Sequence, residues 1–128
     1  RIFRVDLIER LSIVENSDYR IPIDFSLKDA YGPNWGTWTG KNADPPEEVR
    51  LRAEPGMARK FGVTVFHDSQ KVIQHEDGSA DIIFRVANAG EMVPWLMTWG
   101  STVEVIEPEW MRKEVAENAQ SILRMYSS

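Results

Sequence analysis

Two histidines are the residues of this chain best suited to acid–base or metal chemistry. His67 and His75 lie eight positions apart in a sequence of 128 residues, with Asp68, Glu76 and Asp77 close by. Imidazole and carboxylate groups together could bind a metal ion or act as general acid and base. The spacing matches no metal-binding motif, and His75 adjoins an expected turn, where acidic side chains are usually solvated. We therefore expect no metal site and no cofactor.

A catalytic triad is the second kind of site that these residue types suggest. His67, Asp68 and Ser69 supply the residue types, but nucleophile, base and orienting group normally meet across a fold rather than along one segment. The sequence also has no nucleophile motif and no Gly-rich phosphate loop. We expect a protein that is not an enzyme and has no catalytic residue. A small hydrolase using His67 or His75 stays the lesser alternative.

The composition limits the classes of protein further. Hydrophobic residues make up 42% of the chain and include five Trp and five Phe, enough for one compact core. Absence of Cys excludes disulfides and thiolate zinc sites, and it favours the cytoplasm. No apolar run approaches the roughly 20 residues that span a bilayer, so we expect no membrane partner. With a net charge of -5, this piece alone is not expected to hold duplex DNA.

The elements that must position these residues follow from periodicity. Partial alternation over residues 2–14 predicts one or two strands, and a start within a strand indicates a fragment of a longer protein. Residues 15–46 are rich in turn formers but also in aromatic residues, which predicts an ordered linker ending at Pro45-Pro46. Within it, Phe25 to Tyr31 could form a helical turn capped by Asp24 or Ser26.

From Glu48 onward the pattern is regular. Strands are predicted near 48–53, 70–76, 79–87 and 102–107, and helices near 55–62, 90–99 and from Pro108 onward. Asp77-Gly78 predicts a tight hairpin turn with two positive φ angles, and Asn88 is a candidate helix cap. The resulting order, β-α-β-β-α-β-α, predicts an α+β fold, a ferredoxin-like sandwich with an added C-terminal helix.

A domain of this order could also bind RNA or single-stranded nucleic acid through aromatic residues on its third strand. Phe84 is the only aromatic residue between Ala80 and Val86. It shares a face with Ile82 and Val86, so we expect it in the core rather than under a base. The Trp residues near 35–38 and 95–99 are expected to pack in the core, with ligand stacking or interface contacts as the alternative.

Several segments, taken in order, resemble the C-terminal portion of a WYL-family transcriptional regulator. Arg1 to Ile8 resembles the closing strand of the WYL domain, and Asp24 to Trp38 resembles the bridge that follows it. Five later segments resemble successive parts of the family's C-terminal extension, called WCX: Val49 to Arg52, His67 to Gln70, Asp77-Gly78, Trp95 to Gly100 and Val103 to Pro108. The resemblance implies the end of a WYL domain at 1–20, an ordered linker at 21–46 and a WCX-like extension at 47–128.

This resemblance also implies a function. Such regulators join a helix-turn-helix head to a WYL domain of small Sm-like β-barrel form, whose last strand or strands would open this chain. They are generally homodimers, bind DNA through the N-terminal head, which is absent here, and sense a nucleic-acid or small-molecule effector in the bacterial cytoplasm. The implied role of this chain is therefore effector sensing and dimerisation.

The resemblance extends to individual residues. Arg1 and Arg4 match basic positions of the closing strand and are the expected effector-binding residues, although Leu7 stands where the family usually has another Arg. Both arginines could equally be ordinary solvated strand residues. A candidate secondary polar site comprises Arg52, His67, Ser69 and Gln70.

The final helix bears on assembly. Its apolar stripe runs from Met111 to Tyr126 at helical spacing, and Trp110 and Met125 lie off that stripe. A four-stranded sheet offers one face to its two helices, so this third helix has apolar surface to spare. We expect self-association, unless residues 21–38 fold back over Trp110.

Overall fold

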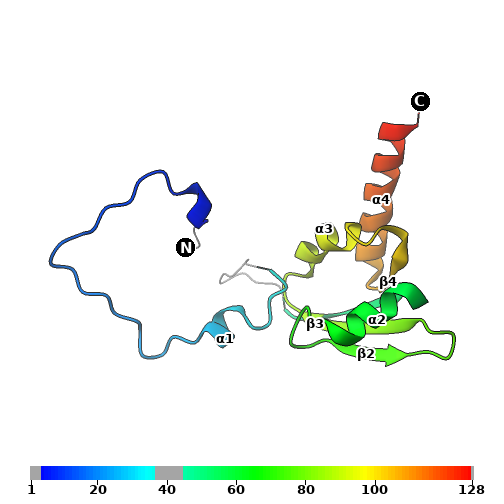
Figure 1. Cartoon of the computed structure of the whole chain (residues 1–128), viewed down its shortest axis with the longest axis horizontal. Helices are drawn as coiled ribbons and strands as arrows, with labels where there is room; N and C mark the ends of the chain where they lie inside the picture. The colour runs from blue at the N-terminus through cyan, green and yellow to red at the C-terminus, as the bar shows by residue number, and fades with distance from the viewer. Residues whose placement is uncertain (1–3, 37–44, 128) are drawn as a thin grey trace.

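A four-stranded antiparallel sheet organises the computed structural model, which describes residues 4–36 and 45–127 (Figure 1). Its strands are β1 (Glu47–Ala53), β2 (Lys71–Gln74), β3 (Ala80–Val86) and β4 (Val103–Glu107), in the spatial order β2-β3-β1-β4. Every neighbouring pair is antiparallel. The predicted α+β class is confirmed.

Among the described residues, four α-helices accompany the sheet: α1 (Leu27–Tyr31), α2 (Pro55–Val63), α3 (Met92–Met97) and α4 (Glu109–Tyr126). Ser26 caps α1 as predicted, since its Oγ accepts the Asp29 N–H at 3.3 Å. The predicted cap at Asn88 is wrong. Asn88 adopts a left-handed conformation (φ 52°), makes no cap hydrogen bond, and donates its amide N–H to Asn34 Oδ1 at 2.8 Å. A 3-10 turn, η2 (Ala89–Glu91), therefore precedes α3.

The hairpin between β2 and β3 is present but looser than predicted. His75 N–H donates to Ser79 O, and Gly78 N–H donates to His75 O. Within this turn Gly78 alone has a positive φ, 85°. The Asp77 carboxylate accepts both the Ser79 hydroxyl and N–H, which lowers the pKa of Asp77. Because this side chain satisfies the turn's polar groups, a second positive φ is not needed.

One face of the sheet carries the core. Alternate residues of β1 and β3 point into it, and Phe84 is 0% exposed, which confirms its predicted core position. The helices cover this face with Ala58 and Phe61 from α2, Met92, Val93 and Leu96 from α3, and Met111 from α4. The opposite face bears Arg50, Arg52 and Arg85 and is not covered by the described helices.

The predicted strand or strands within residues 2–14 are not formed among the described residues. Val5–Leu7 instead make a 3-10 turn, η1, and residues 8–24 have no helix or strand. This part of the chain runs well away from the sheet (Figure 1), with side chains such as Val5, Leu11 and Ile13 more than two-thirds exposed. A strand is stable only when its backbone pairs with a neighbour, and no described strand lies beside this segment.

Candidate functional site

Strand β3 extends beyond the end of its neighbour β2, and the site is built at this overhang. Pairing between them begins at Lys71 opposite Ile83, which leaves the backbone groups of residues 85 and 87 without a partner in β2. Ser69 Oγ accepts the Arg85 N–H at 2.9 Å. Pro33 O accepts the Ala87 N–H at 2.6 Å, and Trp35 N–H donates to Ala87 O at 3.2 Å. The linker thus takes the place of a strand at this edge.

An open groove of about 540 Å³ lies between the linker and the sheet domain. We call it the bridge groove. Its walls come from the linker on one side and from the loop after α2 together with β3 on the other. The lining residues are Lys28, Asp29, Gly32, Pro33, His67, Asp68, Ser69 and Arg85.

The loop of residues 64–70 is held in place by Gln70. Its amide group accepts the Phe66 N–H and donates to the carbonyls of Phe61 and Thr64, each at 2.9 Å. One side chain therefore joins the end of α2 to the loop before β2. Gln70 acts as a support behind the groove rather than as a lining residue.

This support fixes the orientation of His67. Ser69 N–H donates to His67 Nδ1 at 3.1 Å, and the Ser69 hydroxyl oxygen lies 2.8 Å from the same nitrogen. Because Nδ1 is an acceptor, the proton of the neutral ring belongs on Nε2. That Nε2 is buried and has no hydrogen-bond partner among the described residues. The His67 Nε2–H is therefore a donor enclosed by the protein, without an acceptor in the described part of the chain.

Aromatic rings pack behind His67. The Trp35 ring stacks on His67 with centroids 6.1 Å apart, and it contacts Trp95 at 4.6 Å and Phe84 at 5.2 Å. Phe61, Phe66 and Trp99 continue the cluster. The predicted core role of the tryptophans is confirmed for Trp35, Trp95 and Trp99, while Trp38 lies outside the described residues.

A second polar cluster lies on the uncovered face of the sheet, around the buried carboxylate of Asp81. Arg52 Nε donates to Asp81 Oδ1 at 2.7 Å. Arg50 Nε and His75 Nε2 approach the same carboxylate at 3.2 and 3.1 Å. The hydrogen bond from Arg52 is the main cause that lowers the pKa of Asp81 to about 2, against the opposing effect of burial. This carboxylate is a structural anchor for three cationic or protonatable side chains.

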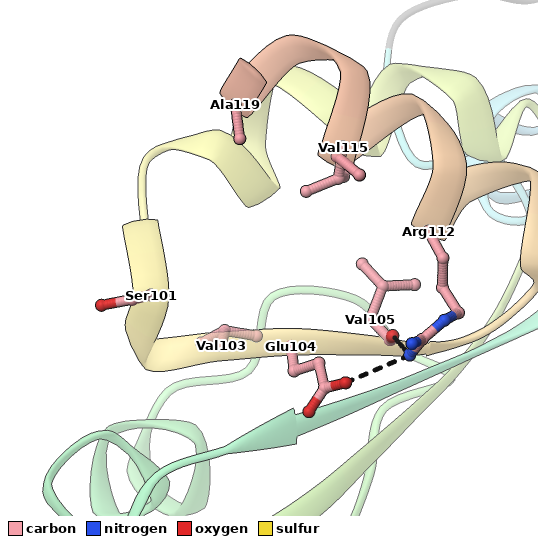
Figure 2. Close-up of a pocket in the computed structure, with 8 residues that line it drawn as sticks. Ser101, Val103, Glu104, Val105, Arg112, Val115 and Ala119 are labelled. Atoms are coloured by element: carbon pink, nitrogen blue, oxygen red, sulfur yellow. Dashed lines mark hydrogen bonds and ion pairs between the residues drawn. The ribbon is translucent and has the colours of Figure 1, made fainter. Parts of the chain in front are cut away.

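A third feature is a groove of about 370 Å³ between β4 and α4 (Figure 2). We call it the α4 groove. Its apolar walls are formed by Val103, Val105, Val115, Ala116 and Ala119. Arg112 borders it, donating to the Val105 carbonyl and pairing with Glu104 at 3.2 Å. Beyond Ala119, α4 continues into a helical end that projects away from the rest of the domain (Figure 1).

The predicted site residues are divided among these places. His67, Ser69 and Gln70 come together at or behind the bridge groove. Arg52 does not join them, because strand alternation directs it to Asp81. Arg4 is exposed and pairs with Asp6, two residues away, and Arg1 lies outside the described residues.

Sequence reasoning missed the linker's contribution to the groove. Lys28 and Asp29 gave no signal, since a contact between a linker and a distant loop has no periodicity. Arg85 could have been found, because it alternates with the inward-facing Phe84 and Val86. Alternation along β1 and β3 also predicts that Arg50, Arg52 and Asp81 share one face of the sheet. Which of them lie opposite each other depends on the strand register, which alternation does not give.

Fold and grooves together define a small α+β domain with two open grooves on its surface. A family model for the WCX domain matches residues 45–123, more than half of the chain, and the chain therefore belongs to the WCX domain family. No curated protein matches the chain. Within residues 4–36 and 45–127, no helix is long and apolar enough to cross a membrane.

Proposed function

We propose that this chain is the regulatory module of a bacterial DNA-binding transcriptional regulator, which senses an effector and holds the homodimer together. The observation that carries the proposal is the WCX match over residues 45–123. Residues 1–20 would then be the end of a WYL domain, 21–46 an ordered linker and 47–128 the WCX extension. DNA would be bound in the cytoplasm by an N-terminal head outside this sequence.

We infer in addition that the body is a ferredoxin-like sandwich with α4 added. The order β1-α2-β2-β3-α3-β4 and the antiparallel arrangement β2-β3-β1-β4 support this inference. So does the contribution of both α2 and α3 to one core face.

A binding role is favoured over catalysis by the partners of the two histidines. In the described part of the chain, His67 contacts the Ser69 hydroxyl but no carboxylate, whereas His75 contacts the Asp81 carboxylate but no hydroxyl. Neither combines the two groups that a hydrolytic triad requires. RNA binding through stacked bases gains no support either, because Phe84 is fully buried.

The α4 face is the surface that we propose for dimerisation. Ile122, Leu123 and Tyr126 are 45%, 63% and 82% exposed and extend the stripe that lines the α4 groove. Trp110 is 40% exposed and donates to Glu47 Oε2 at 3.0 Å. A twofold arrangement places the same stripe on both copies and buries both.

The reading frame upstream of Arg1 tests the proposal directly. We expect it to encode a helix-turn-helix followed by a WYL domain with its Trp-Tyr-Leu signature. Deleting residues 45–128 from that protein should abolish its dimerisation, measured by light scattering, and its response to effector. An initiator Met immediately before Arg1 would contradict the regulatory assignment.

A further inference from the structure

The two halves of α4 present different surfaces on the same side of the helix. Spacings of three and four residues place Arg112, Val115, Ala119, Ile122 and Tyr126 on this side, which we call the α4 seam. In the first half, the seam borders the α4 groove, and Figure 2 shows Val115 and Ala119 on the helix above β4. In the second half, Ile122 and Tyr126 are exposed on a helical end that projects from the domain (Figure 1). One half of the seam is therefore hollow and the other half projects.

A twofold axis at Ala119 brings these halves together in two copies of the chain. Ala119 lies seven residues from both Arg112 and Tyr126. An antiparallel second copy therefore places its projecting half over the groove of the first copy, and the reverse, as a symmetric interface requires. The small side chain of Ala119 lets the two helices approach closely at the axis. A parallel pair instead sets projecting half on projecting half and leaves both grooves to water.

The charges along the seam favour the same direction. Arg112 is the charged residue of the seam, and its side chain is 39% exposed. In an antiparallel pair it lies beside the C-terminal end of the second copy's α4, where the last carbonyl groups have no partner inside the helix and carry partial negative charge. The exposed ring of Tyr126 there also attracts a cation. A parallel pair sets Arg112 against its own copy, and like charges repel.

The area that a stable dimer needs also requires both halves of the seam. A specific dimer buries at least roughly 500 Å² on each copy. A fully exposed aromatic side chain presents roughly 150 to 250 Å², and Tyr126 is 82% exposed. Leu123 and Ile122, at 63% and 45% exposure, add to this area without reaching the minimum. The groove walls must supply the remainder, which happens only when the projecting half of the other copy covers them.

We propose that the α4 groove is the receptor for the C-terminal half of α4 from a second copy of this chain, in an antiparallel pair centred on Ala119. Each copy supplies one groove and fills the other, over a seam about 21 Å long from Arg112 to Tyr126. This assignment rests on the proposed dimerisation role and gives that role a direction and a register.

Disulfide cross-linking of the full chain tests the direction, since the sequence contains no Cys. A disulfide forms only where two Cβ atoms come within about 3.5 to 4.5 Å. We expect oxidised Ala119→Cys to shift from the one-chain to the two-chain mass on a non-reducing gel. A mixture of Arg112→Cys and Tyr126→Cys should cross-link as well, whereas each of these two variants alone should stay at the one-chain mass.

Glu117→Cys is the matched control, because Glu117 is an exposed α4 residue on the side opposite the seam. It should stay at the one-chain mass, and circular dichroism checks that every variant keeps its fold. Cross-linking of Tyr126→Cys alone, with none added by the mixture, would show a parallel pair and overturn the proposal. No more cross-linking in Ala119→Cys than in Glu117→Cys would overturn it too.

Failure of this inference can be told apart from failure of the proposed function. If light scattering shows a dimer but Ala119→Cys does not cross-link, the dimerisation role stands and the antiparallel seam is refuted. If Ala119→Cys cross-links but Leu123→Glu leaves the parent regulator dimeric, the seam stands and its role in the parent falls. A monomeric chain at micromolar concentration refutes the seam, and the upstream reading frame still decides the regulatory assignment.

Discussion

The contact between Trp35 and the WCX domain offers the sharpest test of how the linker is held. Trp35 is half-buried against Trp95, Phe84 and His67. Replacing a fully buried Phe or Trp by Ala costs about 3 to 5 kcal/mol, and part of this ring remains exposed. Its close aromatic contacts contribute about 0.5 to 1.5 kcal/mol beyond the buried area. We therefore expect Trp35→Ala to lower the free energy of unfolding by about 2 to 3 kcal/mol.

Urea denaturation of the full chain, followed by circular dichroism, measures this change. Tyr19→Ala is the matched control, since Tyr19 is an aromatic residue of the same segment with 87% exposure, and it should change stability by less than about 0.5 kcal/mol. A loss below about 1 kcal/mol in Trp35→Ala would refute the docking of the linker. It would also remove one wall of the bridge groove.

Three further predictions concern the core, the loss of stability at acid pH, and assembly. Phe84→Ala should cost about 3 to 5 kcal/mol in the same assay, and a change below about 1 kcal/mol would contradict its burial. Because the folded pKa of Asp81 is about 2, below its ordinary 3.8, its stabilisation is complete above about pH 4 and is lost as the pH falls toward 2. The free energy of unfolding should fall by about 1 to 2 kcal/mol over that interval. Urea denaturation at a series of pH values should show a smaller fall in Asp81→Asn than in the unchanged chain. An equal fall in both proteins would show that the Asp81 carboxylate is not the cause. Leu123→Glu should convert the dimer to monomer in light scattering with little loss of stability, whereas Gln120→Glu, on α4 but off the stripe, should not.

Local patterns were enough to predict most of the WCX domain. Alternation gave the four strands, Pro55 and Pro108 marked the starts of helices, and Asp77-Gly78 marked the hairpin. These signals are reliable because each depends on neighbouring residues only. The strand expected near the N-terminus failed for the opposite reason, since its stability depends on partners that the pattern cannot supply.

The candidate site was predicted only in part, for the same reason. His67, Ser69 and Gln70 are close in sequence, and they also lie close together in the structure. The candidate polar site also includes Arg52, yet the strand register pairs this residue with Asp81. The linker wall was not predicted, because its contacts join residues more than thirty positions apart.

The linker contacts also bear on where the folding unit begins. Sequence composition placed the boundary at Pro45-Pro46, and the family match begins at residue 45. Yet Pro33 and Trp35 supply backbone hydrogen bonds to Ala87, and the Trp35 ring completes the aromatic cluster. A fragment of residues 48–128 keeps all the helices of the core and nearly all of the sheet, so we expect it to melt cooperatively. It should be less stable than the full chain by more than Trp35→Ala alone, because two hydrogen bonds of about 1 kcal/mol each are lost as well. Calorimetry of the two chains measures the difference. A fragment with no cooperative transition would show that the linker is required for folding, whereas a fragment as stable as the full chain would show that the linker is not docked in solution.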